Sequence, residues 1–140
     1  MSATFDSAST FNGDISLWDT SQCIDMSSMF TATFFTGDIS LWNTERVVRM
    51  NGMFETAVSF NSNIGPWNVS NVVSMSRMFR IATAFNQDIS EWDVGQTTAM
   101  DSLFQVRLLF FFEVALCTTH FIFTNKKIMM NLFLYIIFLI

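Results

Sequence analysis

Four tryptophans spaced 24, 25 and 25 residues apart constrain this chain more than any other feature. Each belongs to a group in which a methionine follows eight residues later and a phenylalanine twelve residues later. The members are Trp18, Trp42, Trp67 and Trp92, then Met26, Met50, Met75 and Met100, then Phe30, Phe54, Phe79 and Phe104. A unit this short cannot bury its own apolar face, so successive units are expected to stack and share one core.

Two hydrophobic patterns alternate inside each unit. Met75, Met78, Phe79 and Ala82 follow the i, i+3, i+4, i+7 spacing of one helix face. The Trp-x-Val step that starts at Trp67 alternates apolar and polar residues, as a short strand does. We therefore expect an α/β fold, a right-handed solenoid of about four coils of 24–25 residues, each with a short strand and a short helix. Parallel strands of successive coils would then lie about 4.8 Å apart.

The chain divides in two near Phe104. Residues 1–104 hold eleven acidic and four basic residues, a net charge of −7, whereas residues 105–140 contain no Gly, Pro, Ser, Asp or Trp. We expect residues 1–104 to form the repeat array, truncated at both ends, and residues 105–140 to form an aberrant apolar tail.

Two interpretations of the tail stay open. Its last apolar run, residues 128–140, would span about 20 Å as a helix, short of the roughly 30 Å core of a bilayer. The tail is then either an artefact of the gene model, translated from noncoding sequence, or a short membrane anchor. The second interpretation would make the protein a tail-anchored membrane protein with a solenoid interaction domain.

Composition and residue placement argue against several functions. The net charge of −5 disfavours nucleic acid as a partner, because phosphates require a basic surface. The one histidine, His120, lies in the tail, so neither a catalytic triad nor a zinc site is expected in the array. Cys23 takes the place of Val47 and Val72 in its unit, which indicates a buried apolar side chain. We therefore expect no enzyme and no cofactor.

Two rows of polar residues are candidate functional positions. The middle residue of each Trp-x-Val step should point away from the core and form a ligand-facing strip: Asp19, Asn43, Asn68 and Asp93. A second row precedes the isoleucine of each unit: Asp14, Asp38, Asn63 and Asp88. The strip residues are either ligand contacts or backbone caps. The second row is expected to cap turns, with a calcium site as the alternative.

The sequence also resembles a known repeat. The runs MFETAVSFNSNIGPWNVSNV (residues 53–72) and SMSRMFRIATAFNQDISEWDV (residues 74–94) resemble the repeat of bacterial surface proteins. This repeat is found in BspA-like leucine-rich-repeat surface proteins and in the lipoprotein-associated family of unknown function numbered 285. The resemblance implies a leucine-rich-repeat-like solenoid on a cell surface or in a secreted protein. It also implies adhesion or protein–protein interaction, with a protein or surface glycan as the partner.

Overall fold

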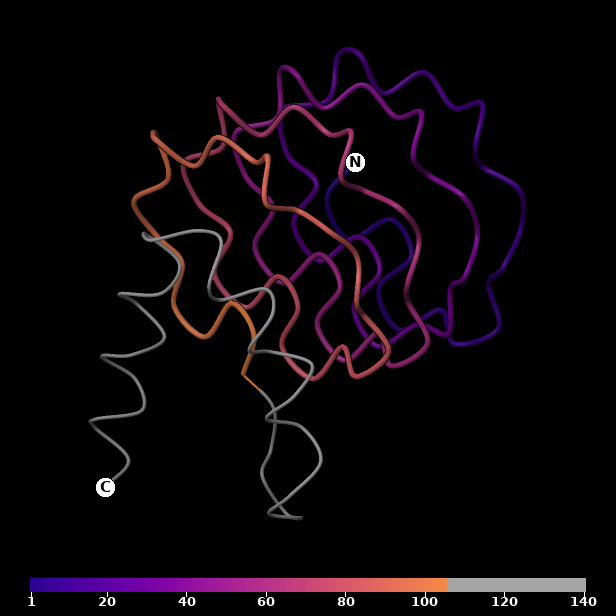
Figure 1. Cartoon of the computed structure of the whole chain (residues 1–140). Coiled ribbons are helices and arrows are strands. Elements are labelled where there is room, and N and C mark those ends of the chain that lie inside the picture. Colours follow the sequence, from indigo (N-terminus) through magenta and orange to yellow (C-terminus); the bar gives the residue numbers. More distant parts are fainter. Residues whose placement is uncertain (106–140) are drawn as a thin grey trace, which may run out of the picture.

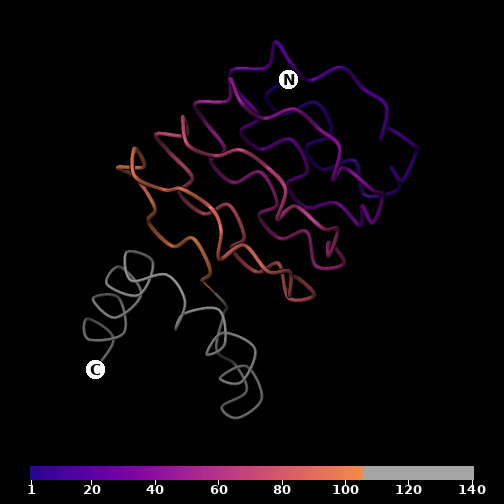
Figure 2. The same cartoon turned by 45° about the horizontal axis from the view of Figure 1, so that its top comes forward.

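The computed structural model describes residues 1–105, which wind into a stack of coils (Figure 1). Backbone hydrogen bonds join residues 23 to 26 positions apart, so each turn of the winding corresponds to one sequence unit. Counted from each repeated methionine, the coils are residues 1–25, 26–49, 50–74 and 75–99, and residues 100–105 begin the next. Figure 2, turned by 45°, shows the same succession of coils from the N-terminus to the orange segment.

The described residues contain no helix and no extended strand. Their only β pairing is a column of isolated parallel bridges, Asp25 with Arg49, Arg49 with Ser74 and Ser74 with Ala99. The expected α/β solenoid with one strand and one helix in each coil is therefore wrong. Each coil consists of tight turns joined by irregular segments instead.

A run of turns, residues 76–81 in the coil 75–99, replaces the expected helix. We call this segment and its equivalents in the other coils the run of turns. In a helix the N–H of Phe79 would bond the carbonyl of Met75, but here it donates to Leu103 in the next coil at 2.9 Å. The N–H of Met78 donates three residues back, to Met75, at 3.2 Å. Alternate N–H groups therefore join neighbouring coils while the others close turns.

Left-handed residues make this alternation possible. Each run contains two of them four positions apart, such as Arg77 with φ 60° and Ile81 with φ 61°. The equivalent positions in the preceding coil are Gly52 with φ 59° and Thr56 with φ 60°. A left-handed residue reverses the local direction of the backbone and so prevents a helix from continuing.

The Trp-x-Val segment does not form a strand either. Trp67 and Val69 are buried and Asn68 is exposed, so the predicted alternation of faces is confirmed. The backbone, however, turns on both sides, because Trp67 N–H donates to Ile64 and Val72 N–H donates to Val69. Neighbouring coils meet here through side chains, as when the Thr44 hydroxyl donates to the Asn68 carbonyl at 2.9 Å.

The core consists of columns of equivalent side chains. Phe30 and Phe54 stack with ring centroids 5.6 Å apart, and Phe79 continues the column 5.7 Å beyond. The repeated tryptophans, methionines and phenylalanines of the sequence units are buried throughout coils 26–49 and 50–74: Met26, Phe30, Trp42, Met50, Phe54 and Trp67. Also buried in these coils are Met29, Phe35, Ile39, Met53, Phe60 and Ile64. The sequence pattern thus predicted which residues are buried, although the backbone beneath them differs from the expected one.

Cys23 departs in part from its expected burial. Val47 and Val72 at the equivalent positions are fully buried, whereas Cys23 is half-buried against the core. Partial burial raises the pKa of its thiol, because the thiolate is less well solvated there.

Two sequence interpretations concern the tail. No helix within residues 1–105 is long and apolar enough to cross a membrane. The candidate anchor at residues 128–140 lies outside the described residues, as does everything in the tail beyond Gln105.

Candidate binding face

The predicted ligand-facing strip lies on the surface of successive coils. Its four residues are all exposed: Asp19, Asn43, Asn68 and Asp93. Each side chain also caps the turn that follows it, since its Oδ1 accepts the backbone N–H two residues on at 2.9–3.1 Å. These hydrogen bonds fix the orientation of each side chain, and hydrogen bonds from Ser21 hold the pKa of the Asp19 carboxyl below its ordinary value.

A second exposed row runs beside the strip, and the sequence analysis missed it. It consists of the residues that precede each tryptophan: Leu17, Leu41, Pro66 and Glu91. Leu17 is 87% exposed and Leu41 is 77% exposed, although both are large apolar side chains. Because both residues flanking a buried tryptophan point outward, alternation along the segment is the signal that could have found this row. We call the two rows together the binding face.

The tryptophans between the two rows anchor the binding face. The indole N–H of Trp42 donates to the carbonyl of Ile15 in the preceding coil at 3.0 Å. The same carbonyl accepts the backbone N–H of Trp18 at 3.1 Å. The carbonyls of Ile15, Ile39 and Ile64 each accept one backbone N–H from their own coil and one indole N–H from the next coil. They therefore link adjacent coils directly beneath the exposed residues.

The second polar row caps turns, as predicted. Asp14, Asp38, Asn63 and Asp88 each accept the backbone N–H two residues on, at 2.9–3.1 Å. These hydrogen bonds lower the pKa of Asp14 and Asp38, with the backbone N–H groups of Ser16 and Ser40 as the main cause. No group of three or more His, Cys, Asp or Glu side chains that could hold a metal ion occurs within residues 1–105.

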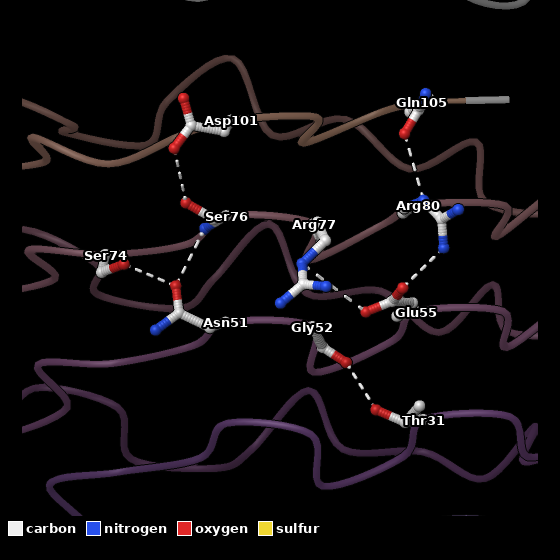
Figure 3. A network of polar contacts seen from close by, with 10 residues as sticks. All are labelled: Thr31, Asn51, Gly52, Glu55, Ser74, Ser76, Arg77, Arg80, Asp101 and Gln105. Carbon is white, nitrogen blue, oxygen red and sulfur yellow. Dashed lines mark hydrogen bonds and ion pairs between the residues drawn. The ribbon is translucent and has the colours of Figure 1, made fainter.

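A polar network covers the run of turns (Figure 3). Arg80 donates to Glu55 in the preceding coil at 2.7 Å and to Gln105 in the following coil at 3.1 Å. The Arg77 Nε lies 4.0 Å from Oε2 of the same glutamate, and the Arg77 side chain is largely exposed. Asn51 makes a similar link, because its Oδ1 accepts the Ser76 N–H at 3.0 Å. The network connects three successive coils and is thus accounted for by holding the stack together.

The expectation that the chain is not an enzyme stays a prediction. His120, on which a triad or a zinc site would depend, lies outside the described residues. What residues 1–105 do present is a surface of rows, each with one side chain per coil. Such a surface is suited to contact with another molecule across several coils.

Comparison with known families gives a match over most of the chain. The profile of the family described as "Mycoplasma protein of unknown function, DUF285" matches residues 1–111. The chain belongs to this family. No curated protein and no solved structure matches the chain.

Proposed function

We propose that this chain is a non-enzymatic interaction module that binds a protein or glycan partner through the binding face. The observation that carries the proposal is the exposure of Leu17 and Leu41 on adjacent coils. Large apolar side chains exposed at equivalent positions of adjacent coils are typical of interaction sites. Neither leucine contributes to the buried core, so its role lies outside the fold itself.

The polar strip supplies specificity in this proposal. Asp19 and Asn43 stand two residues beyond the two leucines, on the same coils. Their turn caps preorganise them, which lowers the entropy lost when a partner binds. The partner therefore contacts the leucines with an apolar group and hydrogen-bonds the strip.

Site-specific variants of the full chain test this proposal. Immobilised chain is exposed to cell extracts, and labelled chain is applied to glycan arrays. The molecules bound in each assay are compared with those bound by a Leu17→Ser/Leu41→Ser variant. Ile24→Ser/Val73→Ser is the matched control, because it removes two exposed apolar side chains from another row. We expect the double leucine variant to bind at least about tenfold more weakly and the control to bind as the parent does. Equal binding by all three proteins would contradict the proposal.

We further propose that the full-length protein displays this module on a cell surface or in a secreted form. The likeness of residues 53–72 and 74–94 to repeats of BspA-like surface proteins supports this placement. Protease treatment of intact cells that make the full-length protein is the test. Cleavage without lysis is expected, and cleavage only after lysis would refute surface display.

A further inference from the structure

Two Asn-Gly pairs occur in the described residues, in opposite environments. Asn12–Gly13 is exposed, and the N–H of Gly13 donates no hydrogen bond within residues 1–105. In Asn51–Gly52, by contrast, Gly52 is buried and its N–H donates to the Ser76 carbonyl at 2.9 Å. The Asn51 amide oxygen also accepts the N–H of Ser76 at 3.0 Å.

Asn-Gly pairs are chemically reactive for a simple reason. The backbone nitrogen of the glycine attacks Cγ of the asparagine, and the absence of a Cβ on glycine leaves this approach open. A new N–Cγ bond forms and the side-chain nitrogen leaves as ammonia, taking the proton of the glycine N–H. Water then opens the resulting succinimide at either carbonyl, giving aspartate or isoaspartate. No oxidation or reduction is involved.

We propose that Asn12 is a site of spontaneous deamidation in the folded protein. We also propose that the backbone hydrogen bonds between coils, here called the coil ladder, protect Asn51. The attacking nitrogen of Gly13 is available in the folded state. The attacking nitrogen of Gly52 is engaged with the next coil, so its pair reacts only after the ladder opens locally.

Deamidation at Asn12 would loosen the first coil from the second. The Asn12 amide donates to the Thr36 hydroxyl at 3.1 Å and accepts the Thr36 N–H at 2.9 Å. The aspartate product can only accept from the Thr36 hydroxyl, which already lies 3.3 Å from Oδ1, so it keeps one of the two links through that hydroxyl. Isoaspartate, in contrast, adds a methylene group to the main chain and displaces the side chain from Thr36. The product also adds negative charge to a stretch that already carries −7.

Peptide mapping of the full chain by mass spectrometry tests the proposal without any substitution. After incubation at neutral pH and physiological temperature, we expect Asn12 to deamidate at least about tenfold faster than Asn51. Asn61–Ser62 and Asn86–Gln87 stand at positions equivalent to Asn12–Gly13 and serve as internal controls, since their second residue carries a Cβ. Both should react more slowly than Asn12.

Incubation in denaturant separates the effect of folding on the deamidation rates from the effect of the local sequence. In urea, Asn12 and Asn51 should deamidate at similar rates, because the ladder no longer protects Gly52. Equal rates in the folded protein, or a rate at Asn51 that stays low in urea, would overturn the proposal. A Gly13→Ala variant should suppress the reaction at Asn12, and undiminished reaction there would also overturn it.

Discussion

The indole N–H of Trp67 donates a hydrogen bond of 3.0 Å to the carbonyl oxygen of Ile39 in the preceding coil. Trp92 repeats this relationship with Ile64 at 3.2 Å. The tryptophans thus bond adjacent coils in a segment that has no backbone ladder, directly beneath the binding face.

Replacing Trp67 by phenylalanine tests the contribution of this bond. We expect Trp67→Phe to lower the free energy of unfolding by about 2 kcal/mol, because a buried carbonyl loses a donor and a cavity is left. Trp18→Phe is the control, since Trp18 is 40% exposed, and its cost should stay below about 1 kcal/mol. Chemical denaturation measures both values, and equal losses would show that the indole bond contributes nothing.

The left-handed positions make an opposite pair of predictions. Gly52→Ala places a Cβ at φ 59° and should cost about 1–2 kcal/mol. Arg77→Gly removes the Cβ that makes the same left-handed conformation unfavourable in the next coil. This substitution should leave the free energy of unfolding unchanged or raise it by up to about 1 kcal/mol. Thermal unfolding of the two variants checks this order, and a reversed order would contradict the assigned turns.

The threonine bonds between coils predict a third effect. Thr44→Val removes the hydroxyl that donates to the Asn68 carbonyl and should cost about 0.5–1.5 kcal/mol. Thr98→Val is the same substitution at an exposed position, where the hydroxyl donates a longer bond of 3.3 Å to the Val73 carbonyl of the preceding coil. Because water competes for that exposed bond, its loss should cost less than about 0.5 kcal/mol. Similar values for the two variants, measured by denaturant titration, would refute a role for the buried hydroxyl.

The capping aspartates predict that acid destabilises the stack. Folding lowers the pKa of Asp14, Asp19 and Asp38 from 3.8, so the unfolded chain binds more protons in this range. The stabilisation is present above that pH and is lost as the pH falls through the folded pKa values.

Melting temperatures recorded from neutral pH downward measure this loss. Asn63 caps its turn without a charge, so the variant Asp14→Asn/Asp38→Asn should keep the caps and show a weaker decline in acid. An unchanged decline would indicate that other groups control the acid sensitivity.

The sequence predicted burial well and backbone conformation poorly, for one reason. A spacing of three and four residues between Met75, Met78 and Phe79 places them on one side of either a helix or a run of turns. What separates the two is the left-handed conformation at Arg77 and Ile81, which neither residue type favours. Hydrogen bonds to the next coil, such as those from the N–H groups of Arg77 and Ile81, offset that cost, and a single unit of sequence does not contain them.

The candidate site was predicted in part. The strip at Asp19 and its equivalents followed from alternation around the tryptophans, and all four residues are exposed. The sequence analysis did not consider Leu17 and Leu41, although the same alternation places them on the outside. Whether the strip binds a ligand stays a prediction.

Scalar coupling across hydrogen bonds, measured by NMR on isotopically labelled full chain, tests the turn-built ladder most directly. The structure places the Phe54 N–H 2.9 Å from the Met78 carbonyl oxygen, as a nitrogen-to-oxygen distance. We therefore predict coupling between the Phe54 nitrogen and the Met78 carbonyl carbon. Coupling to the carbonyl carbon of Met50, four residues back, would instead show a helix and contradict the account.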